Sequence, residues 1–101
     1  MEDLKISNEL ISEVLECNCT DSKIIANELS YEAFGISYVN IYEFAFKCKE
    51  WAFKRGLNLW TDYLGNCQIQ DKDFQLLHDC YSDTEVKVII KASEWLLEQN
   101  K

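Results

Sequence analysis

The segment 40–56, NIYEFAFKCKEWAFKRG, constrains the fold of this chain most strongly, because it carries a full set of signals for an amphipathic helix. Asn40 is a favoured N-cap residue, and Glu43 stands where a capping-box partner is expected. Gly56, directly after two basic residues, suits the left-handed conformation that ends a helix. Between these caps the i, i+3, i+4 spacing predicts one buried face, made of Ile41, Phe44, Ala45, Cys48, Trp51 and Ala52.

A second apolar row on the same helix makes its apolar arc wider than one contact with a sheet requires. The row consists of Tyr42, Phe46 and Phe53. Large exposed aromatic patches are uncommon on monomers, which favours an interpretation in which a loop or another helix covers the row. The alternative is an interface with a protein partner or with a second copy of the chain.

Length and composition predict a single domain over residues 1–101 that can fill a hydrophobic core, since 48% of the residues are hydrophobic. The chain has no apolar run long enough to span a bilayer, and its first residues are acidic and polar, unlike a signal peptide. Five cysteines without the spacing of a small secreted domain agree with a reducing compartment. We therefore expect a cytoplasmic protein that does not bind membranes.

The net charge of −8 disfavours direct nucleic-acid binding, because phosphate neutralisation requires clustered Lys and Arg. The acidic residues are unevenly spread. Residues 2–32 hold eight of them against two lysines, and residues 62–85 hold six against one lysine. Two acidic surfaces are thus expected on either side of a mildly basic helix that carries Lys47, Lys49, Lys54 and Arg55.

The remaining segments predict a mixed α+β chain. A short helix is expected over 7–17, and a helix over 83–99 with Asp83 or Ser82 as its cap. Alternation predicts strands after Gly56, across a tight turn at Gly65, and again over 74–81. The third of these strands is expected to place its even-numbered residues on one face, namely Phe74, Leu76, His78 and Cys80.

Residues 23–34 are ambiguous, because the segment fits either a helix or a hairpin arm that turns near Gly35. We favour the strand, since Ile36 and Tyr38 suit a hairpin that enters the main helix. The final helix is expected to bury Val86, Ile89, Ile90, Ser93, Leu96 and Leu97.

Two strings, FKCKEWAFKRG at 46–56 and IKASEWLLEQN at 90–100, resemble each other at an offset of 44 residues. Each follows a candidate strand segment, which suggests two strand-then-helix units; convergence of two amphipathic helices is the alternative. The fold predicted from these patterns is an antiparallel sheet with two tryptophan-bearing helices on one face, in the approximate order α-ββ-α-βββ-α. Trp51 and Trp95 are expected to anchor the helices, each indole nitrogen bonding a loop carbonyl or water.

The main helix and the C-terminal string TEVKVIIKASEWLLEQNK resemble small uncharacterised proteins encoded by bacteriophages and prophages. The likeness covers roughly the last 60 residues of the chain, and its motifs determine a fold, not a chemistry. It implies a bacterial or phage cytosolic origin and a small accessory role. It implies no activity, cofactor or catalytic residue.

The best candidate for a metal site combines Cys17 and Cys19 with His78 and Cys80, because residues two apart share a strand face and zinc takes four N/S ligands. Structural zinc sites usually have wider spacings, so packed free thiols are the favoured interpretation. His78 is also the one histidine available to activate a thiolate, but no Gly-rich turn follows a cysteine to form an oxyanion site.

We therefore expect no enzyme and no cofactor. The predicted function is that of a small acidic cytosolic protein that binds an as yet unidentified protein partner, or itself as a homodimer, through Tyr42, Phe46 and Phe53. Two alternatives stay open: an acidic inhibitor of the anti-CRISPR type that mimics nucleic acid, and a zinc-binding or Cys-dependent protein.

Overall fold

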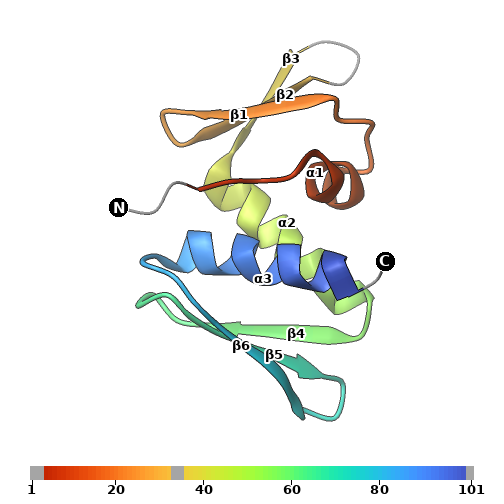
Figure 1. The fold of residues 1–101 in the computed structure, drawn as a ribbon, viewed down its shortest axis with the longest axis vertical. Coiled ribbons are helices and arrows are strands. Elements are labelled where there is room, and N and C mark those ends of the chain that lie inside the picture. The colour runs from red at the N-terminus through yellow and green to blue at the C-terminus, as the bar shows by residue number, and fades with distance from the viewer. Residues whose placement is uncertain (1–3, 33–35, 100–101) are drawn as a thin grey trace.

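The computed structural model describes residues 4–32 and 36–99, and it has the α+β architecture that the sequence predicts. Its elements are α1 (Asn8–Leu15), β1 (Asp21–Ile25), β2 (Glu28–Glu32), β3 (Ile36–Asn40), α2 (Ile41–Lys54), β4 (Leu57–Thr61), β5 (Asn66–Asp71), β6 (Leu76–Tyr81) and α3 (Glu85–Gln99). The strands form two antiparallel sheets, β1-β2-β3 and β4-β5-β6, where we expected one. The helices lie between the two sheets (Figure 1).

The additional strand comes from the ambiguous segment 23–34, whose described part, residues 23–32, is extended, as favoured, but divided by a turn. Ala26 and Asn27 join β1 to β2, and both have positive φ angles, of 48° and 68°. Two such residues in succession form a type I′ hairpin turn, for which Asn-Gly is the usual signature. Alanine in the first position hides this turn in the sequence. The turn expected at Gly35 lies outside the described residues.

Helix α2 begins and ends as predicted. The Asn40 side chain accepts hydrogen bonds from the amides of Tyr42 (2.9 Å) and Glu43 (3.4 Å), and Gly56 follows the helix with φ of 79°. Asn40 is also the last residue of β3, so the first sheet leads directly into the helix. The predicted face is buried in full: Ile41, Phe44, Ala45, Cys48, Trp51 and Ala52.

Helix α3 packs against all three strands of the second sheet and against α1 and α2. Its predicted cap is wrong: the hydroxyl of Thr84 accepts from the Lys87 amide (3.2 Å), while Asp83 forms an ion pair with the Lys87 ammonium (3.2 Å). Because the helix is covered from two directions, Val88 and Ala92 are buried in addition to the expected face, whereas Val86 is only partly buried.

The predicted face of the last strand is wrong in its first half. A register shift between Ile69 and Gln70 pairs Leu76 with Gln70, but His78 with Ile69. Leu76 therefore lies on the exposed side of the sheet, and Phe74 lies in the preceding turn with φ of 63°. A β-bulge of this kind cannot be recognised from alternation alone, because the extra residue reverses the alternation downstream of it.

The two tryptophan-bearing helices each follow a three-stranded sheet, so the chain after α1 consists of two βββα units with separate sheets. Trp95 stacks on His78 of β6, with ring centroids 4.3 Å apart and planes at 1°. Trp51 belongs to the buried core, but its indole nitrogen finds no hydrogen-bond partner among the described residues, so the expected loop carbonyl is not there.

Candidate functional site

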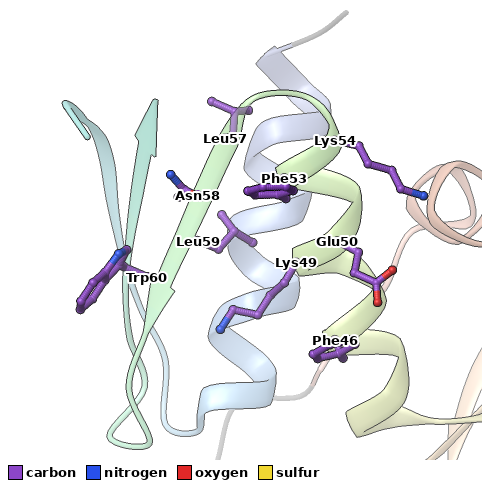
Figure 2. Close-up of a pocket in the computed structure, with 9 residues that line it drawn as sticks. All are labelled: Phe46, Lys49, Glu50, Phe53, Lys54, Leu57, Asn58, Leu59 and Trp60. Carbon is purple, nitrogen blue, oxygen red and sulfur yellow. The ribbon is translucent and has the colours of Figure 1, made fainter. Parts of the chain in front are cut away.

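A groove of about 470 Å³ runs between α2 and β4. It is lined by Phe46, Lys49, Glu50, Phe53, Lys54, Leu57, Asn58, Leu59 and Trp60. Figure 2 shows Phe53 and Lys49 extending from the helix toward the strand, Leu59 extending from the strand toward the helices, and Trp60 pointing to the opposite side of the strand. The groove is therefore a cleft with mainly apolar walls, and a strand forms one side of it.

The aromatic row predicted on α2 is not covered by any described segment. Tyr42, Phe46 and Phe53 are 61%, 63% and 70% exposed, so the interpretation in which a loop or helix covers them is wrong. Phe46 and Phe53 both line the groove, while Tyr42 lies one helical turn before Phe46, beyond the groove. Trp60 is also exposed, at 64%, but on the side of β4 away from α2.

Contacts within the chain join the walls of the groove near both ends of β4. At one end, the Lys49 ammonium donates to the Thr61 hydroxyl (2.9 Å), which donates to a carboxylate oxygen of Glu85 (2.9 Å). At the other end, the chain turns at Gly56, whose amide donates to the Phe53 carbonyl (2.9 Å), and passes directly into β4. These contacts hold α2, β4 and α3 together, so the groove has fixed walls.

The basic residues predicted on α2 do not form one free cluster. Arg55 is engaged, because its guanidinium bonds a Glu13 carboxylate oxygen (2.9 Å) and lies 4.7 Å from the centre of the Trp51 ring. Lys49 and Lys54 line the groove together with Glu50. The groove thus carries a small excess of positive charge on a chain whose net charge is −8.

The four candidate zinc ligands are not brought together. Cys17 and Cys19 follow α1, whereas His78 and Cys80 lie on β6 beyond the helices (Figure 1). Within residues 4–32 and 36–99, no three His, Cys, Asp or Glu side chains are grouped so that they could hold a metal ion. His78 packs flat on Trp95 instead.

The thiols are poorly suited to nucleophilic chemistry. Burial raises the pKa of Cys48 and that of Cys67 to about 12, and burial also raises the pKa of Cys80, which pairs with Cys67 across β5 and β6. A thiol must lose its proton to act as a nucleophile, and these protons are held more tightly than in water. The arrangement around His78 therefore gives no support to a Cys-dependent activity.

Sequence reasoning identified the helical side of the groove but not its strand side. Leu57, Leu59 and Trp60 were expected on a strand, but not beside Phe46 and Phe53. The signal was present in the short connection at Gly56, because a strand that only two residues separate from a helix tends to run back alongside it. An apolar row on the helix and an apolar strand after such a turn together predict a shared groove.

The chain matches no protein-family model, and neither a curated protein nor a solved structure is found to be similar to it. No helix among the described residues is both long and apolar enough to cross a membrane. The site itself therefore has to carry the functional argument.

Proposed function

We propose that this chain is a small, acidic, non-enzymatic cytosolic protein that acts by binding a protein partner through the surface formed by α2 and β4. The observation that carries the proposal is the exposed aromatic row beside a groove with fixed walls. The resemblance of the main helix and the C-terminal string to phage and prophage proteins adds the expectation of an accessory factor of such an origin.

The size of the aromatic surface supports protein binding. Tyr42, Phe46 and Phe53 are 61–70% exposed, and at about 200 Å² for each aromatic side chain they offer roughly 400 Å². That is about half of the roughly 800 Å² that each partner contributes to a standard interface. Aromatic residues are also the type most enriched among the residues that dominate binding energy.

The test is affinity capture from the cytosol of the source cells, with three forms of the protein as bait. Phe46→Glu places a charge in the aromatic surface, and Tyr63→Glu is its matched control, because Tyr63 is 82% exposed and does not line the groove. We expect a partner that the wild type and Tyr63→Glu retain and that Phe46→Glu loses. Retention of the same partners by all three would contradict the proposal.

The uneven distribution of acidic residues favours a second candidate, an inhibitor that occupies the basic nucleic-acid site of its target. Such binding would weaken steeply as salt is raised, because it depends on many screened charge contacts. Binding through the aromatic surface should change little between low and high salt. Repeating the capture at both ionic strengths separates the two candidates, since a mimic would survive Phe46→Glu and be lost in salt.

A further inference from the structure

The strand that forms one side of the groove is an edge strand. Among the described residues, β4 pairs with β5 alone, and its other side faces no strand. The sequence of β4, LNLWT, contains none of the charged residues or prolines with which proteins usually protect such an edge. This edge is therefore a template on which another extended segment can pair.

The register of the hairpin indicates which backbone groups are free. The Asp62 amide donates to the Asn66 carbonyl (3.2 Å), and hydrogen-bonded pairs alternate along antiparallel strands. The backbone groups of Trp60 and Asn58 therefore point toward β5. Those of Thr61, Leu59 and Leu57 point toward the open edge, beside the groove.

The groove can accept side chains of a strand that pairs with the open edge of β4. Side chains alternate between the two faces of a strand, so alternate residues of a segment paired with β4 would face α2, where Phe46 and Phe53 line the groove. The residues between them would lie beside Trp60 on the opposite face. The five residues of β4 span roughly 17 Å, which matches a partner segment of similar length.

We propose that the site binds an extended segment of another protein, which adds a fourth strand to the second sheet at β4. This inference rests on the proposed function and specifies the kind of partner. The segment has apolar residues at alternate positions, which face Phe46 and Phe53, and acidic residues at its two ends, where Lys49 and Lys54 line the groove. Main-chain hydrogen bonds to Leu57, Leu59 and Thr61 supply affinity, and the groove supplies specificity, as in other cases of strand addition.

Charge distinguishes a foreign segment from a second copy of the chain. Each copy carries a net charge of −8, so self-association brings two acidic molecules together. If β4 paired in antiparallel fashion with β4 of a second copy, the Thr61 end of one strand would lie beside the Gly56 end of the other. Lys49, which bonds Thr61, would then approach Lys54 of the other copy. An acidic residue at either end of a foreign segment meets one of these cations, whereas self-pairing brings the two cations together.

The experiment selects peptides from a displayed library of random linear sequences on the wild-type protein, with Phe46→Glu used to remove peptides that bind elsewhere. An enriched peptide is then synthesised, and amide hydrogen exchange of the full chain is followed by NMR with and without it. We expect apolar residues at alternate positions and acidic residues at the ends of the peptide, and at least tenfold slower exchange at Leu57, Leu59 and Thr61 on binding. Asn58 and Trp60, already bonded to β5, should change much less.

Replacing the acidic residues of the peptide by their amides should weaken binding by about fivefold at low salt, the range of exposed charge contacts. Three results would refute strand addition: no enrichment over Phe46→Glu, protection that falls on other segments, or protection of the three edge amides in a dimer without peptide. If the partner captured from cells needs Phe46 for binding but leaves the amides of Leu57, Leu59 and Thr61 unprotected, strand addition is wrong and the proposed function stands.

Discussion

Gly65 provides the sharpest test of the packing that supports the groove, because it joins the β4–β5 hairpin to the start of α3. Its φ is 93°, and an added Cβ would overlap the carbonyl oxygen of Ser82. The Gly65 carbonyl in turn accepts a hydrogen bond from the Ser82 amide (2.8 Å). Gly56 is the matched control, since its φ is also positive (79°) but no atom lies within 4 Å of an added Cβ.

The expected magnitudes follow from these contacts. Alanine at either position adopts a left-handed backbone at a cost of about 1 kcal/mol. At Gly65 the side chain must also displace the Ser82 backbone, which adds about 1 kcal/mol for the hydrogen bond and about 1–2 kcal/mol for the overlap. We therefore expect Gly56→Ala to lower the free energy of unfolding by about 1 kcal/mol, and Gly65→Ala by about 3–4 kcal/mol.

Equilibrium unfolding in urea measures both values, with the slope of the transition checked for a change in the unfolded state. Because proteins of this size are stable by about 5–15 kcal/mol, both variants should still fold at room temperature. If the two alanine variants differ by less than about 0.5 kcal/mol, the close approach of the hairpin to Ser82 is not a feature of the folded protein.

Three further predictions test the core and the helix ends. In the folded state the pKa of Cys48 and that of Cys67 are raised to about 12, whereas in the unfolded chain both thiols have a pKa near 9. The free energy of unfolding should therefore fall as the pH rises above about 9, by up to about 1.4 kcal/mol per pH unit for each thiol. Urea unfolding of the Cys48→Ala and Cys67→Ala variants should show a shallower fall with pH. Asn40→Ala should cost about 1–2 kcal/mol of unfolding free energy in urea, because two amides of α2 lose their acceptor. A double-mutant cycle on His78 and Trp95, measured by thermal unfolding, should give a coupling of about 0.5–1.5 kcal/mol from the stacked rings.

The prediction for Asn40 has a matched control in the same chain. Asn18 is exposed, so Asn18→Ala should leave stability within about 0.5 kcal/mol of the wild type. Equal losses at Asn18 and Asn40 would mean that Asn40 does not cap α2. If removal of both thiols leaves the pH dependence of stability unchanged, Cys48 and Cys67 are not buried as described. A coupling energy near zero between His78 and Trp95 would contradict the stacking of their rings.

The sequence was most informative where local signals agree with packing. The caps and the buried face of α2 followed from Asn40, Gly56 and the helical spacing, because each signal lies within a few residues of the structure that it specifies. The predictions that failed depend on non-local pairing or on unusual backbone. Ala26 adopts a turn conformation that alanine rarely takes, and the register shift beside Ile69 is visible only once two strands are paired.

For the candidate site too, the local features could be predicted from the sequence and the non-local ones could not. Phe46 and Phe53 were identified from their positions on the helix, but whether anything covers them depends on where the second sheet lies. That sheet stands apart from the first because the helices separate them, whereas a single shared sheet was the simplest arrangement of the same strands. The edge of β4, and with it the groove, becomes apparent only in three dimensions.

The most direct test of the account is the footprint of the captured partner on this protein, measured by amide hydrogen exchange of the complex. We predict protection confined to the exposed side of α2 from Tyr42 to Phe53 and to Leu57, Leu59 and Thr61 of β4. Protection that falls instead on the acidic segments 4–32 and 62–85, and leaves α2 and β4 unchanged, would contradict the α2–β4 surface as the binding site.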